Sequence, residues 1–327
     1  METRDIKPVL RIGTRASPLA LAQAEHVRAQ MLATPAFSGY DINLVPITTR
    51  GDKILDKPLA EIGGKGLFTA ELDQGLLEGT LDLAVHSLKD LPTDSSDLFA
   101  IAATPRREDA RDCFISPTNY HNSTTLISNI PQGATIGTAS LRRSAQLLAG
   151  RPDLNIVSIR GNVGTRLQKM IDQKLAGIIL ARAGLNRLGY DDDIGISMDP
   201  DLMLPAAGQG ALAIQCHARN HDLIEKLSVL HDPTTHACVA AERQFLNRLE
   251  GNCRTPIAAF ATIHHNTLTL KGRVLSLDGQ RHHDVSGSVP MVDAVSLADR
   301  LADDVIQNAS DILPPGNGSR SEPQKDH

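Results

Sequence analysis

Three segments of the sequence combine hydroxyl groups and arginines where a predicted strand passes into a predicted helix. They are GTRASP with Arg15 and Ser17, GTASLRR with Thr138, Ser140, Arg142 and Arg143, and RGNVGTRL with Arg160, Thr165 and Arg166. The free N–H groups and positive dipole end of a helix attract carboxylate or phosphate, and a nearby arginine adds a charge-assisted pair. Helix capping alone explains the hydroxyls at any one junction. Three such junctions together favour binding of an anion.

The segment AVHSLKDLP places polar side chains at the end of an apolar strand. Alternation along the strand predicts that Ser87 and Lys89 share a face, with Asp90 next in the chain. A carboxylate beside a lysine at a strand end is a candidate general acid or base, or a group that stabilises a cation. A plain surface ion pair between Lys89 and Asp90 is the alternative. A Ser-His-Asp triad is not expected, because His86 and Ser87 are neighbours that point to opposite faces.

A polar loop over residues 51–66 precedes the next predicted helix, and a loop of this length typically binds ligands or moves. It ends in IGGKGLF, which contains Lys65 and Phe68. This motif lacks the GxxxxGK[ST] spacing of a nucleotide-binding loop, so nucleotide binding is not supported. A flexible turn is the alternative interpretation.

The four cysteines are far apart and include no CxxC pair, which argues against a zinc site and a disulfide framework. Cys113 and Cys216 lie in apolar strands and Cys238 lies on the apolar side of a helix, so these three are predicted to pack in the core. Cys253 lies in a glycine-containing loop beside Arg254, an environment that favours the thiolate. The twelve histidines show no ligand spacing, and no metal site is expected.

Charge is distributed unevenly along the chain. The net charge is 33 − 38 = −5, which argues against a nucleic-acid-binding protein, as does the scarcity of aromatic residues. Between Cys113 and Tyr190, however, the sequence has nine basic residues and two acidic ones. This segment therefore carries a net charge of +7 and the remainder carries −12. Seven of the nine are arginines, whose planar fork suits carboxylates and phosphates. A solvated basic face is the simpler explanation for any one of them.

The hydrophobic pattern predicts an α/β fold followed by a different third unit. In the first half, strands at 8–13, 41–48 and 81–87 alternate with helices at 18–32 and 67–77. The same order restarts at Ala134, and residues 205–216 return to a strand pattern that could rejoin the first lobe. After Pro233 a long helix is followed by strands at 257–264, 267–275 and 284–289 and a helix at 295–306, typical of an α+β domain.

The expected domains are residues 1–104 with 203–230, residues 105–202 and residues 231–313, with a disordered tail at 314–327. No apolar run approaches the roughly 18 to 20 residues of a membrane span. The start METRDIKPVL carries charges where a signal peptide would be apolar. A cytoplasmic protein without membrane contact is therefore expected.

The motifs taken together resemble the porphobilinogen deaminase, or hydroxymethylbilane synthase, family. TRASPLALAQ, TRGD, GGKGLF, AVHSLKDLP, REDARD, GTASLRR, RPDL, RGNVGTRL, AGLNRLG, PAAGQGALAIQ and EGNCRTPIA occur in the family's order from Leu10 to about Leu313. The resemblance implies a cytosolic monomer with two lobes like those of periplasmic binding proteins and a smaller α+β C-terminal domain. It also implies a transferase that joins four porphobilinogen molecules head to tail, releases ammonia, and finally releases linear hydroxymethylbilane by hydrolysis.

The primer implied by the resemblance is a dipyrromethane cofactor held by a thioether on Cys253. Each pyrrole ring of the growing chain carries an acetate and a propionate, which agrees with the cationic segment. The resemblance assigns catalysis to Asp90, Lys89 and Arg15, with Asp90 holding pyrrole N–H groups and stabilising the azafulvene cation. The cofactor-binding residues implied are Cys253, Lys89, Asp90, Thr138, Ser140, Arg142, Arg143, Arg166 and Gln209, and the substrate-binding residues are Arg15, Ser17, Lys65, Phe68, Ser87, Arg160 and Arg187.

The sequence departs from the usual family wording at a few positions. Ala139 stands in GTASLRR where serine is usual, and Asn252, Arg254 and Thr255 stand in EGNCRTP where EGGCQVP is common.

A non-catalytic, two-lobed binding protein for a small anion is the alternative function. Cys253 and Asp90 distinguish the two, because an anion binder has no use for a covalent tether or for a carboxylate facing its ligand.

Overall fold

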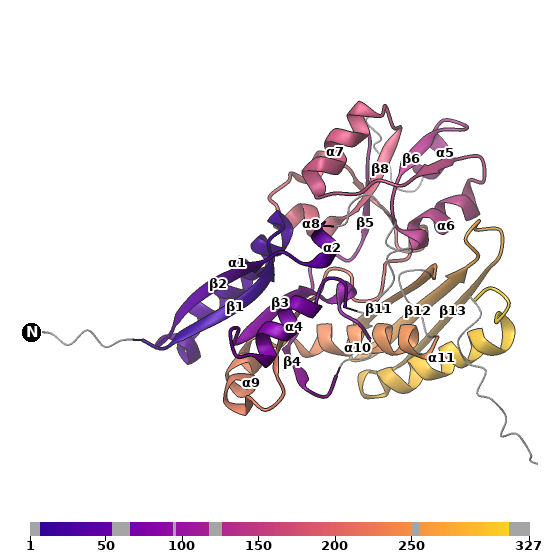
Figure 1. Cartoon of the computed structure of the whole chain (residues 1–327). Coiled ribbons are helices and arrows are strands. Elements are labelled where there is room, and N and C mark those ends of the chain that lie inside the picture. Colours follow the sequence, from indigo (N-terminus) through magenta and orange to yellow (C-terminus); the bar gives the residue numbers. More distant parts are fainter. Residues whose placement is uncertain (1–6, 54–65, 94–95, 118–125, 250–254, 314–327) are drawn as a thin grey trace, which may run out of the picture.

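The computed structural model describes residues 7–53, 66–93, 96–117, 126–249 and 255–313 (Figure 1). The first lobe is built on a five-stranded sheet covered by helices. Its elements are β1 (Val9–Arg15), α1 (Pro18–Leu32), β2 (Asp41–Ile47), α2 (Arg50–Lys53), α4 (Ala70–Leu77), β3 (Leu83–Ser87), β4 (Phe99–Ala103), β10 (Leu212–His217) and α9 (His221–Leu227). Ser17 caps α1, and the helix packs Ala24, Val27 and Met31 into the core of this lobe.

The second lobe contains a sheet of the same size. Its elements are β5 (Asp112–Ile115), α5 (Leu126–Asn129), β6 (Thr135–Gly137), α6 (Leu141–Gly150), β7 (Asn155–Val157), α7 (Val163–Asp172), β8 (Gly177–Ala181), α8 (Arg182–Arg187) and β9 (Ile196–Ser197). Phe114 and Leu147 are buried with Ile136 and Ile179 between this sheet and its helices. The helices therefore cover the apolar side chains of the strands, and parallel strands are normally covered in this way.

The two sheets follow one plan. Their strand orders are β2-β1-β3-β10-β4 and β7-β6-β8-β5-β9. In each sheet three strands are parallel, the fourth is antiparallel to the third, and the fifth is antiparallel to the fourth. The chain thus leaves the first sheet after β4 and returns to it as β10. Because the carboxyl ends of the parallel strands lie at one edge of each sheet, they are the places where ligands are expected.

The third unit is a three-stranded antiparallel sheet packed against two helices. Its elements are α10 (Pro233–Arg248), β11 (Ile257–His264), β12 (Thr267–Leu275), β13 (His282–Pro290) and α11 (Ala294–Asn308). His265 and Asn266, both with positive φ, form the two-residue turn between β11 and β12. A Cβ at Gly272 would lie 2.5 Å from the ring of Phe245, so glycine lets that ring lie directly on the sheet. The expected fold class, two α/β lobes and a smaller α+β unit, is confirmed.

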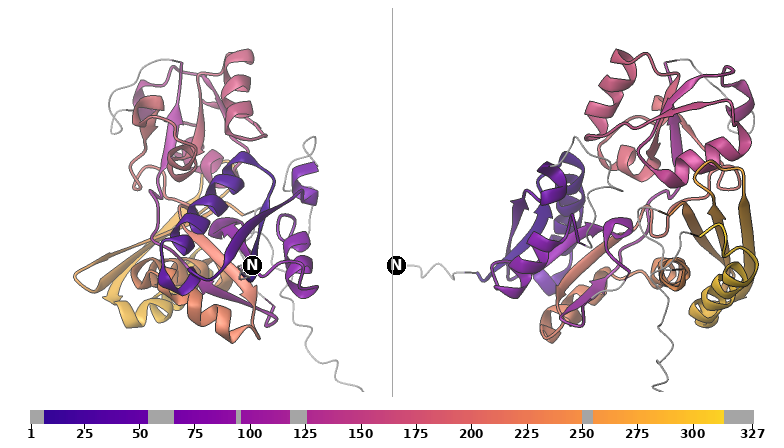
Figure 2. Two further views of the ribbon diagram at one scale, coloured as in Figure 1. Left: turned by 90° about the vertical axis from the view of Figure 1, so that its left-hand side faces the viewer. Right: turned by 45° about the vertical axis from the view of Figure 1, so that its right-hand side comes forward.

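The segments that connect the lobes are attached to the third unit through Glu242 of α10. This fully buried carboxylate accepts hydrogen bonds from the guanidinium of Arg107, at 2.6 and 3.0 Å, and from the backbone N–H groups of Gly208 and Ala261. Arg107 belongs to the outgoing connection and Gly208 to the returning one. Figure 2 shows the three units from two further sides. Helix α8 of the second lobe contacts α1 of the first lobe.

Several elements lie outside the sequence-based prediction, among them β4, α8 and α9. Cys113, Cys216 and Cys238 are buried, free thiols, as predicted, and burial raises the pKa of each, to about 11, 11 and 12. Cys253, Lys65 and the tail at 314–327 lie outside the described residues. Among the described helices, none has the length and apolar character needed to cross a membrane.

Candidate active site

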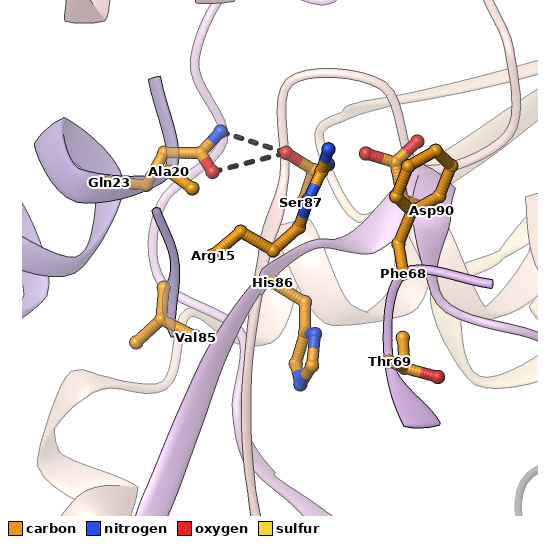
Figure 3. A pocket seen from close by; sticks show the side chains of 9 residues that line it. All are labelled: Arg15, Ala20, Gln23, Phe68, Thr69, Val85, His86, Ser87 and Asp90. Carbon is orange, nitrogen blue, oxygen red and sulfur yellow. Dashed lines mark hydrogen bonds between the residues drawn. The ribbon is translucent and has the colours of Figure 1, made fainter. Parts of the chain in front are cut away.

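A small pocket at the carboxyl ends of β1 and β3 brings together several of the residues singled out in the sequence (Figure 3). Arg15 comes from the end of β1, Ser87 from the end of β3, Phe68 from the turn before α4, and Asp90 from the turn after β3. The pocket is completed by Ala20, Gln23, Thr69, Val85 and His86. Its place at the strand ends matches the general location of ligand sites in open α/β sheets.

The turn that carries Asp90 differs from the sequence-based prediction. Strand β3 ends at Ser87, and Leu88–Asp90 forms a 3-10 turn, so the prediction that Ser87 and Lys89 share a strand face is wrong. Buried Leu88 anchors the turn, with its N–H donating to the carbonyl of Ala211. Gly208 has a φ of +72°, and a Cβ there would lie 3.2 Å from Leu88, so the returning chain packs closely against this turn.

Arg15 is held from two sides. Its guanidinium forms an ion pair with Asp52 and lies over the ring of Phe68, 4.2 Å from the ring centroid. Asp52 also accepts hydrogen bonds from the backbone N–H and the hydroxyl of Thr49. Partial burial opposes ionisation of Asp52, but the hydrogen bonds from Arg15 and Thr49 outweigh it and lower its pKa. The guanidinium therefore has a fixed position beside the pocket.

In the second lobe, Arg142 and Arg143 share one carboxylate. Asp112, which is fully buried, accepts from Arg142 Nη1 and from Arg143 Nη2, each at 2.7 Å, and from Gln209 Nε2 at 2.8 Å. Burial would raise the pKa of Asp112, but the two guanidinium groups outweigh it and hold the pKa far below its usual range. Gln209 in turn accepts from Lys89 Nζ at 3.3 Å. Asp112 and Gln209 thus connect the arginine pair to the turn of Asp90.

Positive charge is in excess around Asp90. Loss of hydration, together with Arg143 and Arg142, lowers the pKa of Lys89 to about 8, although Asp90 opposes this. Loss of hydration, Arg143 and Arg160 likewise lower the pKa of Arg166 to about 10. Arg143 therefore lowers the pKa of one group from each lobe. Because the surrounding carboxylates do not balance these cations, the site suits a ligand with several carboxylates.

Two of the hydroxyls at the predicted junctions serve as helix caps. Ser17 accepts from the N–H of Ala20 at 3.3 Å, and Ser140 accepts from the N–H of Arg143 at 3.4 Å. Thr138 is buried and accepts from the N–H of Ser140. At the third junction, Asn162 rather than Thr165 caps the helix.

Arg187 lies apart from the pocket around Asp90. Its Nη2 donates to the carbonyl of Gly210 at 2.7 Å. Burial lowers its pKa to about 10, against the opposing influence of Glu108. Arg187 therefore contacts the returning connection, two residues before β10.

Three polar residues of this region were not predicted from the sequence: Gln23, Asp52 and Asp112. Asp112 lies one residue before the cationic segment that begins at Cys113, so the charge count did not include it. Asp52 belongs to the TRGD motif, but its ion pair with Arg15 spans 37 residues and has no local signal. Gln23 could have been found, because it occupies a core-facing position of an otherwise apolar helix face.

His86 is a buried histidine whose behaviour with pH can be tested. Burial, assisted by Arg15, lowers its pKa from 6.5 to about 4, against the opposing effects of Gln215 and Asp90. Between pH 6.5 and 4 the unfolded chain binds a proton that the folded protein does not. The contribution of neutral His86 to stability is therefore complete above pH 6.5 and is lost as the pH falls toward 4. The difference in pKa between the folded protein and the unfolded chain corresponds to roughly 3 kcal/mol in the free energy of unfolding.

We therefore expect His86→Gln to remove part of the acid sensitivity of the fold. Urea unfolding at pH 7 and at pH 4.5 measures the loss of unfolding free energy in each protein. The wild type should lose about 2 kcal/mol more than the variant over this range. An equal loss in both proteins would show that His86 becomes protonated in the folded state as readily as in the unfolded chain.

Comparison with known proteins identifies relatives over most of the chain. Residues 10–225 match the family model described as porphobilinogen deaminase, dipyromethane cofactor binding domain, and residues 236–307 match porphobilinogen deaminase, C-terminal domain. The porphobilinogen deaminase of Trichlorobacter lovleyi is 49% identical over 90% of this chain and 92% of its own length. That of Syntrophotalea carbinolica is 46% identical over 93% of this chain and 94% of its own length.

Two of the solved structures that show some likeness to this chain are periplasmic or extracellular proteins. The periplasmic VFT2 domain of Bordetella pertussis BvgS has a TM-score of 0.38 and 12% identity, covering 68% of this chain and 86% of that domain. The probable amino-acid ABC transporter extracellular-binding protein YtmK of Bacillus subtilis has a TM-score of 0.40 and 9% identity, covering 69% of this chain and 90% of that protein.

Proposed function

This chain belongs to the porphobilinogen deaminase family, and we propose that the pocket around Asp90 is where it joins porphobilinogen units into a linear chain. The protein is a hydroxymethylbilane synthase, a transferase of tetrapyrrole biosynthesis with a dipyrromethane cofactor. One observation supports this location of the reaction. Asp90 lies in one pocket with Arg15 and Ser87, and its charge acts on Lys89 and Arg166. A carboxylate surrounded by cations suits a substrate that carries both carboxylates and a developing positive charge.

We assign the side chain of Asp90 as the catalytic carboxylate. When ammonia leaves porphobilinogen, the C–N bond breaks with its electron pair on nitrogen, and the methylene pyrrole that remains is cationic. The Asp90 carboxylate would stabilise this charge and hold the pyrrole N–H. A new bond then joins the methylene carbon to the free α-carbon of the preceding ring, which loses a proton. Asp90 is placed to accept that proton or to pass it to the departing amine.

We assign the cationic side chains around Asp90 to binding the carboxylates of substrate and product. Arg15, with Ser87 beside it, is placed to bind an acetate or propionate of the incoming porphobilinogen. A part in substrate binding is also proposed for Ser17, Lys65, Phe68, Arg160 and Arg187, of which Lys65 lies outside the described residues. Lys89 acts with Asp90, since its pKa of about 8 leaves most of the side chain protonated at neutral pH. Four additions and a final hydrolysis complete the proposed reaction.

The residues around Asp112 fit a cofactor that carries carboxylates. Two buried arginines share a single carboxylate there, which leaves positive charge for an anionic group to neutralise. We assign its binding to Lys89, Asp90, Thr138, Ser140, Arg142, Arg143, Arg166 and Gln209, and its thioether to Cys253. When bound, dipyrromethane supplies the pyrrole terminus to which the first substrate ring is joined.

The intact mass of the denatured protein tests this proposal. We expect an excess equal to two deaminated porphobilinogen units, located by peptide mapping to the peptide that contains Cys253. Cys253→Ser should abolish the excess, whereas Cys238→Ser, which changes a buried packing residue, should retain it. A wild-type protein that keeps the bare polypeptide mass after incubation with porphobilinogen would instead favour an anion-binding protein without a covalent primer.

The organisation of the working enzyme also belongs to the proposal. We assign residues 1–104 with 203–230, 105–202 and 231–313 to three domains of one chain, which acts as a monomer on a small molecule. Glu242, which binds both connections between the lobes, would set the limits of their relative motion. The buried free thiols are consistent with a reducing compartment, and we place the enzyme in the cytoplasm.

A further inference from the structure

Gln23 is a polar side chain on the otherwise apolar buried face of α1. It is 3% exposed, and its neighbours on the buried face of α1 are Ala20, Ala24 and Val27. Burying an amide in such surroundings is unfavourable unless its groups form hydrogen bonds. Gln23 therefore needs a partner, and the structure supplies one in Ser87.

The contact between Gln23 and Ser87 is reciprocal. The amide Nε2 of Gln23 donates to Ser87 Oγ at 2.8 Å, and Ser87 Oγ lies 3.2 Å from Gln23 Oε1, which can accept the hydroxyl proton (Figure 3). Because the shorter bond uses a lone pair of Oγ, it fixes the oxygen and leaves the proton free to rotate. The hydroxyl can then donate to Gln23 or to an anion in the pocket.

We infer that Gln23 is a positioning residue that holds the Ser87 hydroxyl as a hydrogen-bond donor to a carboxylate of porphobilinogen. The inference rests on the proposed function, which places the substrate in this pocket. Gln23, Ser87 and Arg15 all line the pocket, so the hydroxyl and the guanidinium can act on one carboxylate. Asp90 lines the pocket as well, so this carboxylate would be bound beside the group that is assigned to catalysis.

The test is a kinetic comparison of Gln23→Leu and Gln23→Glu with the wild type, all loaded with cofactor. Gln23→Leu should raise the KM for porphobilinogen about tenfold with kcat nearly unchanged, because it removes uniform binding from one hydrogen bond. Gln23→Glu has the same shape but cannot donate from a charged carboxylate and repels the substrate carboxylate, so KM should rise further. Gln30→Leu, on the same helix but outside the pocket, is the control and should keep the wild-type KM.

A double variant separates positioning from a structural role. If Gln23 acts through Ser87, the KM of Gln23→Leu with Ser87→Ala should equal that of Ser87→Ala alone. Additive effects, or a wild-type KM in Gln23→Leu when Ser87→Ala raises it, would overturn the inference while leaving the proposed function intact. A wild-type KM in both Ser87→Ala and Arg15→Lys would instead contradict the proposed place of the substrate. Thermal unfolding and intact mass verify that each variant is folded and carries the cofactor.

Discussion

Replacing Asp90 by asparagine is expected to slow turnover of porphobilinogen by about a hundredfold to a thousandfold while the cofactor stays attached. Asparagine keeps the size of the side chain but cannot supply the negative charge that faces the cation formed as ammonia leaves. Groups aimed at charge that develops in a transition state typically contribute about 3 to 4 kcal/mol, which corresponds to this factor. Alanine at the same position, which leaves no polar group there, should abolish turnover.

Two measurements on the same preparation decide the outcome. Steady-state formation of product gives kcat, and the intact mass of the denatured protein gives the cofactor content. Asp172→Asn, on an exposed part of α7 where the side chain only accepts from Gln168, is the matched control and should retain both. A normal rate in Asp90→Asn would remove Asp90 from the mechanism. Loss of the cofactor mass would move its role from catalysis to cofactor assembly.

The elements with strong local signals are those that the sequence predicts well. Ser17 and Pro18 mark the start of α1, and the helix ends at Leu32 as its apolar period predicts. Alternating residues likewise predict β11 and β12 with the bounds that the structure has. In these segments capping, turn residues and periodicity favour the same structure, so no tertiary contact has to override them.

The turn at Leu88–Asp90 shows where local patterns fail. The apolar run of β3 continues into Leu88, and alternation therefore predicts that Ser87 and Lys89 share a face. In the structure Leu88 is instead fixed by Ala211 and packed against Gly208, which are more than 100 residues away in the chain. A three-residue turn set by such distant contacts has no signal of its own in the sequence. The roles of Asp90 and Lys89 were nevertheless suggested, because residue type rather than exact geometry carried that hypothesis.

The arginines of the cationic segment show a second limit. Their number predicts an anion site, but charge counting treats all arginines as equally available. In the structure Arg151 is paired with Asp153, Arg182 donates to Ser197 and Gly195, and Asp112 engages two more. The three-dimensional structure separates arginines held by the fold from those in electrostatic contact with Asp90. A count of charges cannot do so, because it does not show which partner each guanidinium has, and Asp112 lies about 30 residues from Arg142 and Arg143.

Asp112 should therefore be essential for the stability of the second lobe. We expect Asp112→Ala to lower the free energy of unfolding by about 3 to 5 kcal/mol, because it leaves the buried guanidinium groups of Arg142 and Arg143 without a counter-charge. Urea unfolding at pH 7 measures this change. Asp222→Ala, which removes the exposed partner of Lys226, is the control and should leave the unfolding curve unchanged.

The same variant tests whether the arginine pair binds cofactor carboxylates. If it does, a carboxylate of the cofactor would replace part of the charge that Asp112 supplied, and cofactor binding should stabilise Asp112→Ala more than it stabilises the wild type. Unfolding of both proteins before and after loading with porphobilinogen, with the load verified by intact mass, measures the two differences. Equal stabilisation would place the cofactor carboxylates away from Arg142 and Arg143. An unfolding free energy of Asp112→Ala equal to that of the wild type would show that these arginines do not depend on Asp112.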